Sequence, residues 1–138
     1  MIKIVKGDIL ACNCNVIIQQ VAMDNSLSKL NSKIAMKYPG STEKFKNIKK
    51  QSGCVFFSEE DSLIIANCLT KNEDGKIIFK DVANAFEYVK TICLVGKHRT
   101  VAMEYNYCDD NRRANRKILR IAKRIFKKDK FVTLEVLK

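Results

Sequence analysis

Apolar residues recur along the chain with two periods, one typical of strands and one typical of helices. The strand-like runs lie at residues 2–5, 16–22, 54–57, 62–68, 99–105 and 130–138. Helical spacing predicts a helix after Ser28, a short one from Thr42 to before Gly53, and longer ones over 79–95 and 109–128. Several strand runs are continuously apolar, which is typical of strands covered on both faces.

Turn and cap residues separate these elements. Ser28 is suited to cap the first helix, which Pro39-Gly40 is expected to end. An acidic turn at 59–61 is expected between two strands, and Gly75 marks a later loop. The order β-β-α-α-β-β-α-β-α-β, without repeat or linker, predicts one domain over residues 1–138. Its expected fold class is α/β, a three-layer α/β/α sandwich with a mixed central sheet of about six strands.

Composition narrows the class of protein. The chain of 138 residues is 46% hydrophobic with one Pro and five Gly, which favours an ordinary globular domain. No apolar run has the length of a membrane helix, and the first residues enter a strand pattern without a secretory leader. We therefore expect a cytoplasmic protein, a monomer that neither binds membranes nor requires a cofactor.

Six cysteines could indicate metal or disulfides, but their spacing argues otherwise. Cys12 and Cys14 form the only close pair, and no C-x-x-C or second histidine accompanies it. Cys54, Cys68 and Cys93 lie in apolar segments, where a free thiol behaves as a small hydrophobe. We expect structural thiols and no metal site.

A formal net charge of +11 suggests an anionic partner. Much of the charge lies on the last predicted helix, which has no acidic residue between Asp110 and Asp129. The residues suited to contact a nucleic-acid backbone there are Arg112, Arg113, Arg116 and Arg120. Aromatic residues for base stacking are nearly absent from this helix, and a surface that serves solubility is the alternative.

The opening, "IKIVKGDILACNCNVIIQQV", resembles the start of a macrodomain, a strand followed by Gly-Asp-Ile and a second apolar strand. The segments "IAMKYPG", "KQSGCVFF" and "LTK" resemble the branch of terminal ADP-ribose protein glycohydrolase and phage ADP-ribose-1″-phosphatase-like proteins. The resemblance covers essentially the whole chain, although each motif is short. It implies a macrodomain fold and a site for ADP-ribose or a related adenine nucleotide.

The resemblance also implies roles for individual residues. Asp8 would accept a hydrogen bond from the adenine amino group, and Ile9 would line the adenine pocket; a solvated turn aspartate is the alternative for Asp8. Lys71 would attack the distal ribose, with Asp110 assisting. An ordinary exposed lysine and a helix N-cap by Asp109 or Asp110 are the competing interpretations.

Two glycine-rich phosphate loops of the family are missing. The stretches at the expected places are "LNSKIA", residues 30–35, and "EYNYCDDN", residues 104–111. Lys29 and Lys33 could replace backbone amides at a phosphate, or could be the solvent face of a helix. Asn31 could replace glycine in a left-handed conformation, and Tyr105 and Tyr107 could stack on the ligand or close the pocket.

Two functions remain open at this stage. The first is binding of ADP-ribose or a related nucleotide, with hydrolysis of an ADP-ribosyl linkage as a further activity that the lost glycines put in doubt. The second is a non-catalytic scaffold whose basic face binds nucleic acid or a protein partner.

Overall fold

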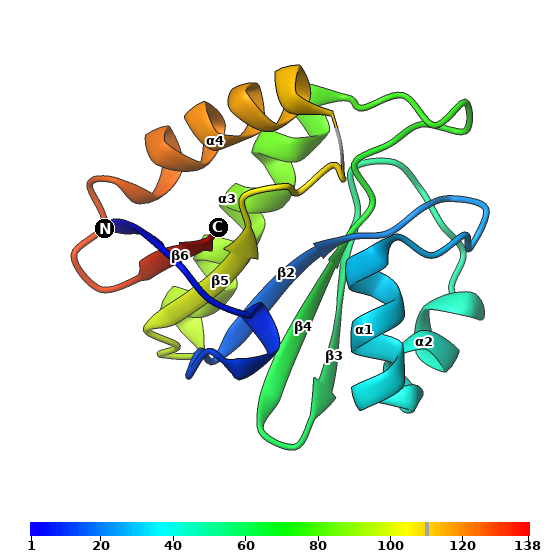
Figure 1. Cartoon of the computed structure of the whole chain (residues 1–138), viewed down its shortest axis with the longest axis horizontal. Coiled ribbons are helices and arrows are strands. Elements are labelled where there is room, and N and C mark those ends of the chain that lie inside the picture. Colours follow the sequence, from blue (N-terminus) through cyan, green and yellow to red (C-terminus); the bar gives the residue numbers. More distant parts are fainter. Residues whose placement is uncertain (110) are drawn as a thin grey trace.

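The expected mixed sheet is present in the computed structural model, which describes residues 1–109 and 111–138, apart from the side chain of Phe45 (Figure 1). Its strands are β1 (Ile2–Val5), β2 (Val16–Gln20), β3 (Val55–Glu60), β4 (Leu63–Cys68), β5 (Thr100–Glu104) and β6 (Thr133–Leu137). They lie in the order β1-β6-β5-β2-β4-β3. Neighbouring strands are parallel except for β3 and β4, which form an antiparallel hairpin.

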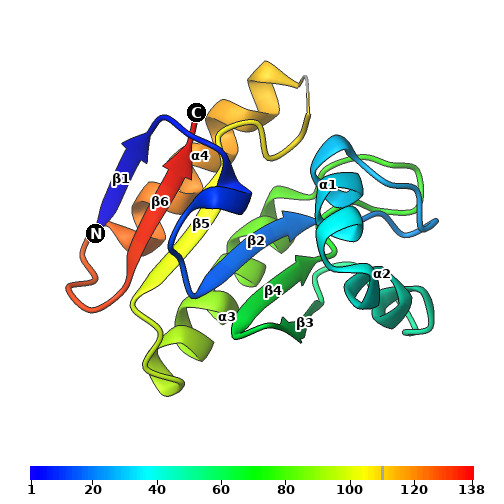
Figure 2. The same cartoon turned by 60° about the horizontal axis from the view of Figure 1, so that its bottom comes forward.

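Helices cover both faces of the sheet. They are α1 (Lys29–Lys37), α2 (Pro39–Lys46), α3 (Phe79–Val95) and α4 (Arg112–Phe126), with a 3₁₀ turn, η1, at Ile9–Ala11. Figure 2 shows α1 and α2 on one side and α3 and α4 on the other. The three-layer α/β/α sandwich predicted from the sequence is confirmed.

Alternation along the central strands divides the apolar side chains between two cores. In β2, Val16 and Ile18 face the larger core beneath α3 and α4, which contains the fully buried Phe86. Ile17 faces the smaller core, where Leu30 and Ile34 of α1 pack. Because β2 is buried on both faces, its residues form the continuous apolar run seen in the sequence.

Some predicted boundaries were wrong. Pro39 does end α1, but it also begins α2, because proline is favoured in the first helical turn, where no N–H is needed. The hairpin turn is not the acidic triplet. Glu59 and Glu60 belong to β3, and the two turn residues are Asp61 and Ser62, both with positive φ.

Helix α4 begins later than expected, at Arg112. Asn111 is its N-cap, and the Asn111 side chain accepts a hydrogen bond from the backbone N–H of Ala114 at 3.1 Å. Asp109 therefore does not cap the helix, and Asp110 lies outside the described residues.

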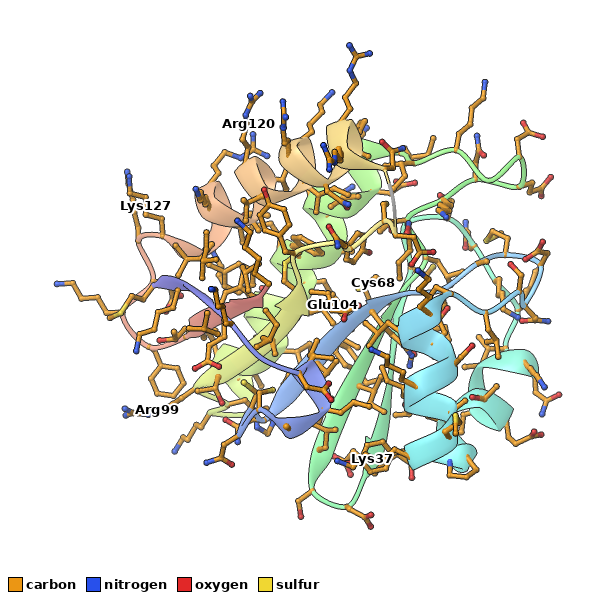
Figure 3. The ribbon with its side chains drawn as sticks, viewed as in Figure 1. Lys37, Cys68, Arg99, Glu104, Arg120 and Lys127 are labelled. Atoms are coloured by element: carbon orange, nitrogen blue, oxygen red, sulfur yellow. The ribbon has the colours of Figure 1, made fainter. Side chains whose placement is uncertain are left out.

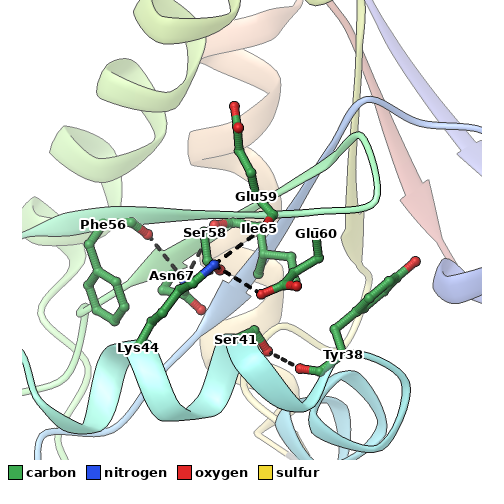
Figure 4. Close-up of polar contacts among 9 residues, drawn as sticks. All are labelled: Tyr38, Ser41, Lys44, Phe56, Ser58, Glu59, Glu60, Ile65 and Asn67. Atoms are coloured by element: carbon green, nitrogen blue, oxygen red, sulfur yellow. Dashed lines mark hydrogen bonds and ion pairs between the residues drawn. The ribbon is translucent and has the colours of Figure 1, made fainter.

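The edge strand β3 is covered by α2 (Figure 4). The Lys44 ammonium contacts the Glu60 carboxylate at 3.2 Å and the carbonyl oxygen of Glu59 at 3.4 Å. Behind them, Asn67 of β4 donates to the carbonyl oxygen of Phe56 at 3.2 Å. These contacts hold β3 against α2 on one side and β4 on the other.

The six cysteines are free thiols, and among the described residues no helix is long and apolar enough to cross a membrane.

The strand order predicts a crevice at the carboxyl ends of β2 and β5. Strands β2 and β5 are neighbours, but the chain leaves β2 for α1 on one face and β5 for α4 on the other. Such a reversal leaves a gap at the carboxyl ends of the strands, where α/β proteins usually bind ligands.

Candidate functional site

A cavity of about 860 Å³ opens at this reversal, between the first turns of α1 and α4. We call it the crevice. Its lining residues are Gly7, Lys29, Leu30, Lys33, Glu104, Tyr105, Asn106, Asp109, Arg112, Asn115, Arg116, Leu137 and Lys138. The volume lies within the range of about 300–1,000 Å³ that is usual for small-molecule sites.

Cations line the crevice from two opposite helices. Lys29 and Lys33 lie one turn apart on α1, and Arg112 and Arg116 lie one turn apart on α4. The ion pairs found within residues 1–109 and 111–138 join Lys44 to Glu60 and Lys90 to Glu87, so none involves these four side chains. Their positive charge is therefore available to an anion in the crevice.

Glu104 lies at the end of β5, in the middle of the molecule beside the crevice (Figure 3). Burial raises the pKa of its carboxyl above the usual value. The positive charge of Lys33 opposes this shift, and the negative charges of Asp109 and Asp8 add to it. The crevice thus combines cations with one half-buried acid.

A smaller cavity, of about 120 Å³, adjoins the crevice at Asp109. Its lining residues are Gln20, Ala22, Ser26, Leu27, Ser28, Asn31, Lys71, Tyr107 and Asp109. Lys71 is half-buried there and pairs by a β-bridge with Ile77. The structure therefore brings Lys71 close to the crevice, in a cavity that Asp109 also lines. Asp110, the residue predicted to assist Lys71, lies outside the described residues.

Asp109 has a φ of 41°, in the left-handed region that glycine usually occupies. The buried side chain of Asn115 supports this loop, because it accepts from the backbone N–H of Cys108 at 2.7 Å and donates to the carbonyl oxygen of Asp109 at 3.1 Å. A backbone shape typical of glycine thus persists in the second loop without a glycine.

Asn31 does not take the left-handed conformation considered for it. It lies in the first turn of α1, where its side chain completes a capping box with Ser28. The side-chain amide also donates to Gln19 Oε1 at 2.7 Å and to the carbonyl oxygen of Gln20 at 2.9 Å. Left-handed backbone occurs earlier, at Asn25, with a φ of 64°.

Asp8 is exposed at the end of β1, next to Gly7 in the crevice wall. Its Oδ1 accepts from the backbone N–H of Leu10 at 3.0 Å and caps η1, which leaves Oδ2 free of described partners. Ile9 is only 1% exposed and packs in the smaller core, so it supports the crevice from below without lining it.

The two tyrosines differ in place. Tyr105 lines the crevice, with the Lys138 ammonium 5.0 Å from its ring centre. Tyr107 is buried, its hydroxyl lies 2.8 Å from Thr70 Oγ1, and its ring packs edge-on against Phe86. Burial raises the pKa of the Tyr107 hydroxyl. Its ring therefore belongs mainly to the core and is not presented for stacking.

The outer face of α4 forms a second, basic groove of about 460 Å³, lined by Arg112, Arg113, Arg116, Lys117 and Arg120. Figure 3 shows Arg120 pointing away from the sheet on this helix. Arg112 and Arg116 border both this groove and the crevice.

Sequence reasoning missed Glu104, Asn115 and Lys138 as crevice residues. Glu104 offered one signal, an acid directly after the apolar run "VAM" in a basic chain. The described residues contain no group of three or more His, Cys, Asp or Glu that could hold a metal ion.

No protein-family model matches the sequence, and no curated protein is similar to it in sequence. Solved structures are similar in fold. The macrodomains of Thermus aquaticus DarG and Mycobacterium tuberculosis DarG both superpose with a TM-score of 0.84, at 13% and 14% identity. The alignment with the first covers 100% of this chain and 98% of that one, and with the second 99% and 97%. The chain has the macrodomain fold.

A macrodomain protein from Streptomyces coelicolor superposes with a TM-score of 0.74 at 13% identity, over 100% of this chain and 99% of that one. The macrodomain fold expected from the opening motif is thus confirmed along the whole chain. Within this macrodomain fold, the crevice is built from side-chain cations where the sequence lacks the glycine-rich loops.

Proposed function

We propose that the chain binds ADP-ribose or a related adenine nucleotide in the crevice. The observation that carries the proposal is the pairing of Lys29 and Lys33 with Arg112 and Arg116 across a cavity of about 860 Å³. Arginine and lysine side chains bind phosphate groups through strong charge-assisted hydrogen bonds.

The cations explain how a phosphate would be held without glycine loops. A glycine-rich loop presents backbone N–H groups, whereas α1 and α4 present full charges on long side chains from both faces. Asp8 is the neighbour of Gly7, which lines the crevice, and we assign it the hydrogen bond from the adenine amino group through the oxygen that does not cap η1.

Hydrolysis of an ADP-ribosyl linkage is the further activity that we assign to the smaller cavity. The support is that Lys71 and Asp109 line it together, next to the crevice. The resemblance gives Lys71 the role of nucleophile toward an opened ribose, which requires a neutral amine. Loss of turnover in Lys71→Ala with unchanged affinity for ADP-ribose would support this assignment, and unchanged turnover would contradict it.

The test of binding is calorimetric titration with ADP-ribose. We expect a dissociation constant on the order of micromolar, which corresponds to a binding free energy of about −8 kcal/mol. Arg116→Gln should weaken binding, whereas Arg124→Gln on the exposed side of the same helix should not, although both remove one charge. Asp8→Asn should also weaken binding, because its amide keeps an oxygen for Leu10 but loses the second acceptor. Absence of heat with ADP-ribose and with other adenine nucleotides would overturn the proposal.

Nucleic-acid binding is a second candidate, favoured by the five cations of the groove on α4. It predicts a strongly salt-dependent gel shift of a single-stranded oligonucleotide. The double variant Arg113→Gln/Arg120→Gln should abolish the shift and leave ADP-ribose binding intact, since neither residue lines the crevice.

A further inference from the structure

Glu104 is the half-buried acid of the crevice, and its position follows from the pleat of β5. Ala102, two residues earlier, packs in the smaller core on the α1 side, and Met103 packs in the larger core. Alternation along the strand therefore directs Glu104 toward the α1 side, where Lys33, Asp8 and the crevice lie.

The carboxylate of Glu104 has no hydrogen-bond or ion-pair partner within bonding distance among residues 1–109 and 111–138. Lys33 interacts with it only as a more distant charge, while Asp109 and Asp8 repel it. A half-buried carboxylate without a partner disfavours the folded state, as the raised pKa of the Glu104 carboxyl also indicates. Packing alone gives no reason for an acid at this position.

A ligand would supply the missing partner. The crevice cations of α1 and α4 favour an anionic ligand, and a carboxylate among them can only accept hydrogen bonds. A ligand that satisfies both carries an anionic group, such as a phosphate, together with hydroxyl or amino donors, such as those of a ribose or an adenine ring.

We propose that Glu104 is a specificity residue of the crevice, accepting a hydrogen bond from a hydroxyl or amino group of a phosphate-bearing ligand. The proposal rests on the nucleotide-binding function above. In the free protein the Glu104 charge lowers folding stability, and it gains a partner only when the ligand is bound.

Opposite effects on stability and binding distinguish this role from a structural one. Glu104→Gln keeps the shape of the side chain but removes the charge. Its thermal midpoint should be at or above that of the wild type at pH 7, while its affinity for ADP-ribose falls about tenfold or more, as expected for loss of a charged hydrogen bond. Glu59→Gln, at an exposed position of β3, removes the same charge and should change neither quantity.

A pH series on the wild type gives a second readout. The charged groups that act on Glu104 are Lys33 of α1, Asp8 before η1 and Asp109 before α4. The other charged residues that line the crevice are Lys29, Arg112, Arg116 and Lys138. Because the pKa of the Glu104 carboxyl is raised, the fall in wild-type affinity on acidification should begin at a higher pH than an ordinary glutamate would give. The Glu104→Gln variant should lack that part of the fall.

Each outcome decides a separate point. Unchanged affinity in Glu104→Gln, with the wild type binding ADP-ribose, would overturn the role of Glu104 and leave the proposed function standing. A lowered thermal midpoint together with weaker binding would show that Glu104 acts structurally. Absence of nucleotide binding by the wild type would overturn both proposals.

Discussion

Asp109 has a left-handed backbone at the entrance to α4, between the crevice and the smaller cavity. Most residues other than glycine are strained by about 1–2 kcal/mol in this conformation, and aspartate is among those that adopt it more readily. The two hydrogen bonds from Asn115 to the flanking backbone hold the loop in place. A single residue thus takes a backbone conformation typical of glycine, and the side chain of Asn115 supports it.

Substitution at this position should reveal the strain. We expect Asp109→Gly to be at least as stable as the wild type, and Asp109→Val to lose about 1–3 kcal/mol, because a β-branched side chain is least tolerated at positive φ. Urea unfolding of both variants measures the difference. Glu73→Val, at an exposed position without positive φ, is the control and should change little. Equal stability of the Gly and Val variants would argue against strain.

At the scale of elements, a buried chain of amides fixes α1 to the sheet. Asn31 donates to Gln19 of β2, and Gln19 donates to Asn67 of β4 at 2.7 Å. Asn67 in turn reaches the backbone of β3 at Phe56 (Figure 4). All three amide side chains are buried. This series of amide hydrogen bonds therefore fixes the position of the first turn of α1, with Lys29 and Lys33, at the crevice.

Removal of the first amide should be costly. Asn31→Ala leaves Gln19 Oε1 and the carbonyl oxygen of Gln20 without their donor, and each buried unsatisfied group costs about 1–3 kcal/mol. We expect a loss of about 2–4 kcal/mol in the free energy of unfolding, measured by chemical denaturation. Ser32→Ala, at the next and exposed position of α1, should have little effect. If Asn31→Ala lost no more free energy of unfolding than Ser32→Ala, the amide hydrogen bonds would contribute no stability.

At the scale of the whole molecule, positive charge lies where the strand order creates the crevice. The chain has a net charge of +11. Several of its cations face each other across the crevice, where α1 and α4 begin on opposite faces of the sheet. Part of the positive charge thus lies at the site that the strand order creates, where it attracts anions.

This arrangement predicts a clear salt dependence. The affinity for ADP-ribose should fall between 50 mM and 500 mM salt, because screening weakens the attraction of partly exposed cations. The double variant Arg112→Gln/Arg116→Gln should bind more weakly and with a flatter dependence, as measured by titration at several salt concentrations. An affinity independent of salt would argue against cations as the phosphate ligands.

The sequence by itself determined the succession of elements, since periodicity is a local property of neighbouring residues. Strand 2–5 and helix 79–95 were placed with their observed bounds, and the macrodomain fold followed from "VKGDIL" and the order of elements. It also brought forward Lys29 and Lys33 for a phosphate, and Arg112 and Arg116 for a nucleic-acid backbone, because charges on a helix surface are visible in its spacing.

Only the tertiary structure decided which of those charges meet. The crevice joins residues from the end of β5, the start of α1 and the start of α4, and their proximity depends on strand order rather than on sequence distance. The structure also showed that Tyr107 is buried in the core, whereas Tyr105 lines the crevice. It also gave Glu104 its significance, because a carboxylate is unremarkable in a sequence and becomes informative only when packing removes its water and supplies no partner.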